Sequence, residues 1–249
     1  MALPIFGLDG GEVAPHQWRD AAQEIERQGY DSIWVFDAIG RGFPLPDPLM
    51  ALTMAATVTE RVELGTGVLQ TAIRNAAEIA HRVLTLARVA DGRLLFGVGP
   101  GSTADDFAAF GGDYAGRGRR FAEQVPVLEA LLTTGKHEGV DLSPWPGVAG
   151  RVPLYIGAWR GGWIERAARD HAGWIASAMH NDDTALATTL ARFRDAGGRR
   201  AIVTNVQLGA DLAPAIERVQ HLGALGFDDV VVLDLTPSFE RMATLRAAL

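Results

Sequence analysis

The chain contains no cysteine among its 249 residues, and Lys136 is its single lysine. The missing cysteines exclude a disulfide scaffold, a thiolate zinc site and a cysteine nucleophile. Lys136 lies past the end of an expected helix rather than on a strand, so a Schiff-base aldolase would lack its amine. The lack of cysteine also fits a reducing compartment, and we expect a cytoplasmic protein.

Targeting and nucleic-acid signals are also missing. No stretch approaches the roughly 20 apolar residues of a membrane span, and Met1–Gly11 lacks the basic and apolar regions of a signal peptide. The net charge of −7 and the absence of basic runs argue against nucleic acid as a partner. We therefore expect neither a membrane nor a nucleic-acid partner.

Several well-known catalytic motifs do not occur. The sequence has no His-Glu-x-x-His motif, no phosphate-binding loop with its lysine, and no Gly-x-Ser-x-Gly elbow. Its histidines and carboxylates show no metal-ligand spacing. A chain without a metal site, an activated nucleophile or a suitable lysine is expected to leave its chemistry to an organic cofactor.

What is present is a regular alternation of short apolar runs with amphipathic stretches. Continuous apolarity is typical of strands that are covered on both faces of a parallel sheet. The predicted strands are Leu3–Leu8, Ser32–Phe36, Val62–Thr66, Leu94–Val98, Leu154–Gly157, Gly173–Ser177, Ala201–Leu208 and Val230–Leu233. Eight strands with intervening helices, at about 31 residues per unit, predict an α/β fold, a single (β/α)8 TIM-barrel domain over residues 1–249. An open doubly wound sheet is the alternative.

Two glycine-rich turns follow predicted strands, where the active site of a barrel lies. Gly97–Ser102 is either a tight turn or a backbone wall that a flat ring can approach closely. Gly157–Gly162 precedes a helix start, where free N–H groups and Arg160 could hold a phosphate. The simpler interpretation of the second turn is a loop with a solvated arginine.

Single polar residues at strand ends allow two interpretations each. Asp37 directly follows the second strand and is either functional or part of a helix cap or loop salt bridge. His180 is either a phosphate donor or a surface histidine. Arg117, Arg119 and Arg120 are expected to form a solvated cluster at a helix start, although a loop over the barrel mouth could use one of them.

Four stretches of this sequence, in the right order, are similar to a known family. They are Gly29–Asp37, Thr59–Leu69, Asp91–Gly101 and Pro153–Ala158. They resemble the bacterial luciferase-like family of flavin- and coenzyme F420-dependent oxidoreductases, and the likeness covers roughly residues 3–178 well. The resemblance implies a TIM barrel that binds F420, or alternatively FMN, at the carboxyl ends of its strands, together with a small-molecule substrate.

The resemblance also implies roles for individual residues. Asp37 lies near the ring system and is the predicted catalytic residue. Gly67-Val68 matches a non-prolyl cis peptide that backs the ring. The implied cofactor-binding set is Asp37, Thr66, Gly67, Val68, Gly99, Gly101, Ser102, Gly157, Ala158, Trp159, Arg160, Gly161, Ser177 and His180, the first part beside the ring and the last seven along the phosphate tail.

Three positions depart from the family pattern. Ala38 replaces a histidine that is common in F420-using relatives, Ser102 replaces an acidic residue, and His180 replaces a lysine. These changes argue against a sugar-phosphate substrate. They leave open a non-catalytic flavin-binding or structural member of the family, and a cofactor-free isomerase or lyase that uses Asp37 and His180 as acid and base.

The resemblance carries two further expectations. Relatives commonly dimerise, so we expect a homodimer. Relatives are also usually longer, with insertions after the fourth and seventh strands, so the short insertions here predict an unusually open cofactor face.

Overall fold

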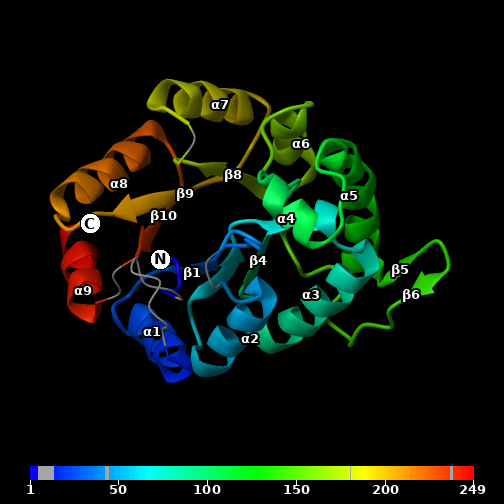
Figure 1. The fold of residues 1–249 in the computed structure, drawn as a ribbon, viewed down its shortest axis with the longest axis horizontal. Helices are drawn as coiled ribbons and strands as arrows, with labels where there is room; N and C mark the ends of the chain where they lie inside the picture. The colour runs from blue at the N-terminus through cyan, green and yellow to red at the C-terminus, as the bar shows by residue number, and fades with distance from the viewer. Residues whose placement is uncertain (5–13, 43–44, 180, 236–237) are drawn as a thin grey trace.

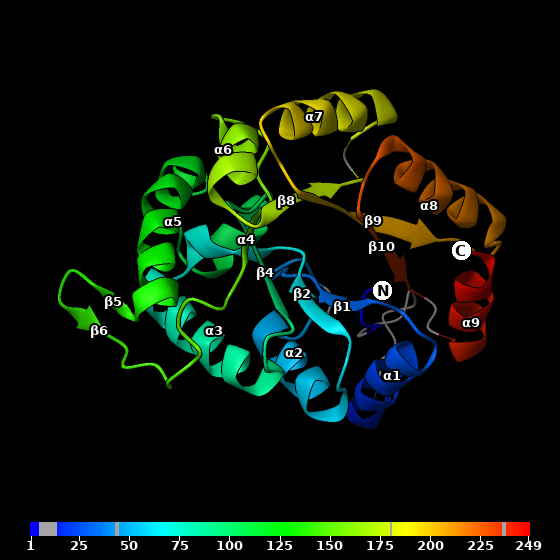
Figure 2. The same ribbon diagram turned by 180° about the vertical axis from the view of Figure 1, so that it is seen from behind.

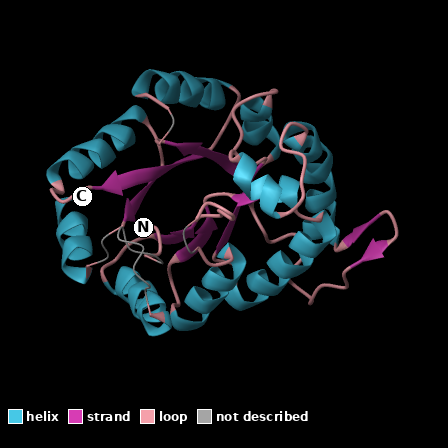
Figure 3. Ribbon diagram, in the orientation of Figure 1, coloured by secondary structure: helices cyan, strands magenta, loops and turns pink. Residues whose placement is uncertain are grey.

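The computed structural model describes residues 1–4, 14–42, 45–179, 181–235 and 238–249. A ring of helices surrounds a set of parallel strands (Figures 1 and 3), which are hydrogen-bonded in the order β1-β2-β4-β7-β8-β9-β10. The strands of this sheet are β1 (Ser32–Val35), β2 (Glu63–Thr66), β3 (Leu69–Gln70), β4 (Leu94–Gly99), β7 (Leu154–Ile156), β8 (Gly173–Ser177), β9 (Arg200–Leu208) and β10 (Asp229–Asp234). The predicted α/β barrel is confirmed. Seven of the eight predicted strands lie within one residue of their predicted bounds, whereas β3 was not predicted.

The N-terminal segment joins the two ends of this sheet. The N–H of Ala2 donates to the carbonyl of Val232 in β10 at 2.8 Å. The N–H of Leu3 donates to the carbonyl of Trp34 in β1, also at 2.8 Å. Met1–Leu3 therefore occupies the place of the first predicted strand and nearly closes the barrel. Residues 5–8 of that predicted strand lie outside the described residues.

Several helices begin where a polar side chain caps the first turn. Asp47 accepts hydrogen bonds from the N–H groups of Leu49 and Met50, and Pro48 stands at the first helical position, where its missing N–H costs nothing. The helices are α1 (Pro15–Arg27), α2 (Pro48–Val58), α3 (Ala76–Ala90), α4 (Ala104–Ala109), α5 (Arg117–Thr134), α6 (Trp163–Asp170), α7 (Asp183–Asp195), α8 (Ala213–Leu225) and α9 (Phe239–Ala248), with a 3₁₀ turn at Thr71–Ile73.

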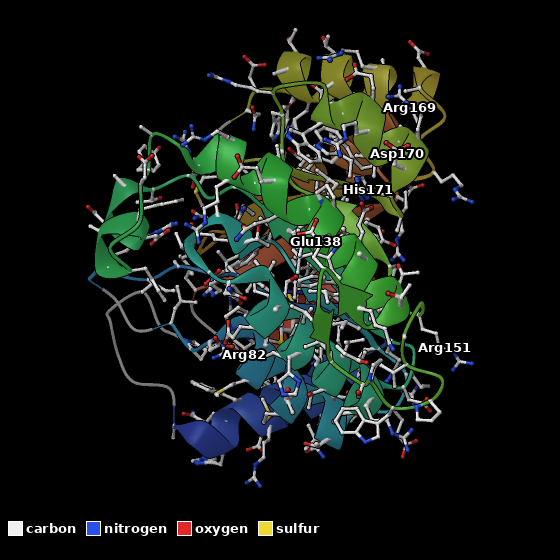
Figure 4. The ribbon with its side chains drawn as sticks, turned by 90° about the vertical axis from the view of Figure 1, so that its right-hand side faces the viewer. Arg82, Glu138, Arg151, Arg169, Asp170 and His171 are labelled. Atoms are coloured by element: carbon white, nitrogen blue, oxygen red, sulfur yellow. The ribbon has the colours of Figure 1, made fainter. Side chains whose placement is uncertain are left out.

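Apolar side chains fill two layers. The larger one lies between the helices and the sheet, and the smaller one includes Trp34, Leu95, Tyr155 and Ile175 inside the barrel. Trp34 is fully buried, and a Cβ on Gly65 would lie 2.4 Å from its ring. Gly65 is therefore required by the packing of the barrel interior. The outer surface is charged, as Arg82 and Arg169 in Figure 4 illustrate.

Two insertions differ from the sequence prediction. The loop after β4 contains the short helix α4, which was not predicted and which packs Phe107 against Ala72 and Ile73. The segment after α5 contains an antiparallel hairpin of β5 (Lys136–His137) and β6 (Val140–Asp141), also not predicted, that projects from the ring of helices (Figure 2). Lys136 lies in this hairpin, past the end of α5, as expected. No helix in the described ranges is both long and apolar enough to cross a membrane.

Candidate functional site

A cavity of about 1220 Å³ opens at the carboxyl ends of the barrel strands. Its lining comes from the carboxyl-terminal parts of β8, β9 and β10 and from the segments that follow β1, β2, β4, β7, β8 and β10. This volume exceeds that of ordinary drug-sized pockets, which reach about 1,000 Å³. The cavity is therefore large enough for a cofactor and a substrate together.

Most of the predicted site residues line this cavity. Those on the lining are Asp37, Gly67, Val68, Gly101, Ser102, Gly157, Ala158, Trp159, Arg160, Gly161 and Ser177. Thr66 and Gly99 lie just behind it, and His180 lies outside the described residues. The structure thus brings together predicted residues from five different strand ends, as the barrel topology requires.

The peptide bond between Gly67 and Val68 is cis, as the resemblance implied. It interrupts the third strand, so that β2 ends at Thr66 and β3 starts at Leu69. A Cβ on Gly99 would lie 2.7 Å from Cγ2 of Val68, and one on Gly157 would lie 2.6 Å from its Cγ1. Both glycines are needed to leave room for the Val68 side chain, which forms an apolar wall of the cavity.

Thr66 anchors the strand below this wall. Its Oγ1 donates to the carbonyl of Gly97 at 2.7 Å and accepts from the Gly97 N–H at 2.9 Å. The side chain is fully buried and does not reach the cavity. Thr66 therefore fixes β2 to β4 rather than contacting a ligand in this arrangement.

Asp37 is part of a buried ion pair. Its Oδ2 accepts from Nη1 of Arg74 at 2.6 Å and its Oδ1 accepts from Nη2 at 2.9 Å, while the N–H of Gln70 adds a third bond at 2.8 Å. The two charged side chains are 1% and 7% exposed. Burial has the largest effect on the pKa of Asp37 and raises it, while Arg74 and the Gln70 N–H oppose that rise. Of the interpretations that the sequence allowed for Asp37, this geometry matches the salt bridge.

A second buried carboxylate, Asp106 of α4, joins the same network. It accepts from Nε of Arg41 at 3.0 Å, from the Ile39 N–H at 2.9 Å and from Nε2 of Gln70 at 2.8 Å. Burial alone raises the pKa of Asp106, but Arg41, Ile39 and Gln70 together outweigh it and hold the pKa below its ordinary value. The network ties α4 to the loops after β1 and β3, and so shapes one side of the cavity.

The lowered pKa of Asp106 predicts an acid-dependent loss of stability. The unfolded state takes up the proton first as the pH falls, so this contribution is complete above the ordinary aspartate pKa of about 4 and is lost below it. We expect the free energy of unfolding in urea to fall less steeply for Asp106→Asn than for the unmodified chain between about pH 5 and about pH 3. Asp105→Asn, in the same helical turn, controls for the removed charge. Parallel curves for the unmodified chain and Asp106→Asn would contradict this prediction.

Two arginines give the cavity positive charge. Within the described ranges neither Arg117 nor Arg160 forms an ion pair, whereas Arg41 is paired with Asp106. Arg117 lies over the Tyr114 ring, 3.9 Å from its centroid, and its Nε donates to the carbonyl of Gly101 at 3.2 Å. The cluster predicted at the start of α5 is thus divided: Arg117 lines the cavity, and Arg119 is exposed near Glu123.

The turn before α6 has the properties of an anion site. Gly161 and Gly162 both have positive φ, at 67° and 75°, and no side chain caps the first N–H groups of the helix. Arg160 and Gly161 line the cavity there, and Trp159 packs edge-on against Trp174 with ring centroids 5.0 Å apart. Free N–H groups at a helix start favour a negative ligand, and Arg160 adds a full charge.

Comparisons with known proteins identify relatives of this chain. A 4-hydroxyprotoasukamycin monooxygenase of Streptomyces nodosus subsp. asukaensis is 34% identical over 119 residues, 47% of this chain and 32% of that protein. An F420-dependent glucose-6-phosphate dehydrogenase of Kineococcus radiotolerans is 29% identical over 238 residues, 86% of this chain and 70% of that protein. The chain therefore spans from about a third to about two thirds of the lengths of these relatives.

Solved structures share the fold. Monooxygenase RslO1 from Streptomyces bottropensis superposes with a TM-score of 0.81 at 18% identity, covering 100% of this chain and 96% of that one. The FMN complex of the oxygenating constituent of 3,6-diketocamphane monooxygenase from Pseudomonas putida gives 0.67 at 17% identity, covering 85% and 67%. The two expected cofactors, F420 and FMN, thus both occur among the similar proteins.

The family model described as luciferase-like monooxygenase matches residues 4–208, which include every predicted site residue. This chain belongs to the luciferase-like monooxygenase family.

Proposed function

We propose that this protein is an oxidoreductase that binds F420, or alternatively FMN, in the cavity and acts on a small organic molecule beside it. The observation that carries the proposal is the wall at Gly67-Val68, where two glycines make room for one apolar side chain. Such a wall suits a flat ring. The relatives named as F420-dependent dehydrogenase and monooxygenase support the same reaction class.

The residues of the cavity fit a cofactor with an aromatic ring and a phosphate tail. Val68 offers an apolar surface to the ring. Arg160, Gly161 and the start of α6 suit a phosphate, and Arg117 adds a second cation at the rim. When bound, such a cofactor supplies the transfer of a hydride, and the protein contributes orientation and exclusion of water.

For Asp37 we propose a positioning role rather than a proton transfer. Both of its oxygens already accept hydrogen bonds from Arg74 or Gln70. Its contact with the Gln70 N–H fixes the short strand β3 directly after the wall. A carboxylate held in this way shapes the cavity and is poorly placed to take a proton from a substrate.

A second candidate function is cofactor binding without catalysis. The cavity lining in the described residues contains one carboxylate, the paired Asp37, while Ala38 and Ser102 replace the residues that relatives use to handle protons. His180, the remaining candidate for an acid or base, lies outside those residues. A protein of this kind would bind the cofactor but not turn over a substrate.

A titration with F420 and with FMN, followed by absorbance, tests the proposal. We expect micromolar binding of at least one of them, and about tenfold weaker binding for Arg160→Gln or Arg117→Gln, since each loses a charge-assisted hydrogen bond of about 1.5 kcal/mol or more. The exposed Arg169→Gln on the same α6 is the control and should bind normally. Absence of binding to both cofactors contradicts the proposal, and binding without turnover of any hydroxyl or carbonyl compound favours the second candidate.

A further inference from the structure

Strand β9 contains a bulge at the rim of the cavity. In its pairing with β10, Val203 stands opposite Val230 and Val206 opposite Val232, so Thr204 and Asn205 together face one residue, Val231. Bulges of this kind often lie beside active sites, where they redirect a side chain. Asn205 adopts a left-handed conformation with φ of 67°, which costs energy for any residue except glycine and which asparagine tolerates best.

Hydrogen bonds fix the orientation of the Asn205 amide. Its Nδ2 donates to Oγ of Ser177 and to Oγ1 of Thr204, both at 3.1 Å. The Thr204 hydroxyl uses its own hydrogen on the carbonyl of Ala176 at 3.0 Å, so it can only accept from Asn205. Both amide hydrogens are therefore used, and Oδ1 remains as an acceptor with no partner among the described residues.

Ser177 carries the complementary donor. Its Oγ accepts from Nδ2 of Asn205 and from the Met179 N–H at 3.4 Å, which occupy its acceptor positions. Its hydroxyl hydrogen has no acceptor within the part of the chain that the structure describes. Ser177 and Asn205 both line the cavity and are half-buried. They therefore present a donor and an acceptor side by side, a pair named here the Ser177–Asn205 pair.

This pair stands close to the Gly67-Val68 wall. A Cβ on Gly67 would lie 3.4 Å from Cγ2 of Thr204, the residue just before Asn205, across the barrel interior. The proposed phosphate segment Gly157–Gly161 and the turn Gly99–Ser102 belong to other strand ends. The pair is thus next to the proposed ring site. The resemblance placed Ser177 along the phosphate tail, but its contacts tie it to Asn205, so we assign it to this pair instead.

We propose that the Ser177–Asn205 pair binds the oxygen of a neutral, hydroxyl-bearing organic substrate, and this rests on the proposed function. An alcohol O–H donates to Oδ1 of Asn205 while its oxygen accepts from the Ser177 hydroxyl. One hydroxyl group satisfies both the free acceptor and the free donor. The cavity-lining residues of β8 and β9 carry no charge, so this part of the cavity suits a neutral group. Binding of a substrate hydroxyl also explains the left-handed conformation of Asn205, because this conformation holds Oδ1 as an acceptor beside the proposed ring site.

The test measures binding of cyclohexanol and of cyclohexyl methyl ether, which lacks the donor, to the cofactor-loaded protein by amide chemical shifts. We expect the unmodified protein to prefer cyclohexanol about tenfold, the value of one hydrogen bond. Asn205→Gly keeps the left-handed backbone and removes the amide, so it should abolish this preference. Ser177→Ala should weaken both ligands. Gln207→Ala, which removes an exposed amide from the same strand and cavity, should change neither by more than about twofold.

The same samples are titrated with F420 and FMN, which separates the two proposals. Normal cofactor binding together with an unchanged preference in Asn205→Gly, or no preference in the unmodified protein, overturns the assignment of the pair to a substrate hydroxyl. About tenfold weaker cofactor binding in Asn205→Gly assigns the pair to the cofactor instead and also overturns it. Failure of the unmodified protein to bind either cofactor is a failure of the proposed function.

Discussion

Asp37→Ala is expected to lower the free energy of unfolding by about 3–5 kcal/mol, because it leaves the buried guanidinium of Arg74 without its carboxylate. The side chain of Arg74 is 7% exposed, and its remaining hydrogen-bond acceptor among the described residues is the carbonyl of Gln70, at 2.8 Å from Nη1. One carbonyl cannot replace a bidentate carboxylate. Urea unfolding of the two proteins measures the difference.

The double variant Asp37→Ala/Arg74→Met is the control for this pair. It removes both charges, so we expect it to be more stable than Asp37→Ala alone. Asp37→Asn separates stability from chemistry. If Asp37 positions the cavity, cofactor binding and turnover should fall together with stability. A variant that folds and binds cofactor normally but has lost turnover would show that Asp37 is the catalytic residue, as the family resemblance implies.

The barrel could be predicted from the sequence because its signals are local. Continuous apolar runs mark the buried strands. The start of α2 is marked by Asp47-Pro48, where the cap and the N–H groups that it accepts from are neighbours in the sequence. The position of the cavity then follows from the topology, since parallel strands present their carboxyl ends on one side. The short helix α4 was missed because six residues with two adjacent aspartates carry no helical periodicity.

The polar network behind the site could not be predicted because its partners are far apart in the sequence. Asp37 and Arg74 are separated by 37 positions, and Arg41 and Asp106 by 65. Nothing local distinguishes Asp106 from its neighbour Asp105, although one is buried and the other exposed. Asn205 could not be singled out from the sequence, because its left-handed conformation depends on a bulge set by the register of β9 against β10.

Gly157→Ala is expected to weaken binding of F420 or FMN by at least about tenfold. The added Cβ would lie 2.6 Å from Cγ1 of Val68, so the valine must move out of its place in the wall. Overpacking of this kind costs about 1–3 kcal/mol, and a displaced valine takes up the space proposed for the ring. Gly99→Ala, with a contact of 2.7 Å to Cγ2 of the same side chain, should behave in the same way. Absorbance titration measures the affinity of each variant.

Two further variants show whether the contact with Val68 is the cause. Gly118 also lines the cavity, but a Cβ there would meet nothing within 4 Å, and its helical position favours alanine by about 0.5–1 kcal/mol. Gly118→Ala should therefore bind the cofactor normally. Val68→Ala removes both methyl groups that Gly157→Ala would meet, so the double variant should be more stable than Gly157→Ala alone and should bind like Val68→Ala. If the losses of cofactor affinity in the two single variants add up in the double variant, Gly157 acts through the backbone of its turn and not through its contact with the Val68 side chain.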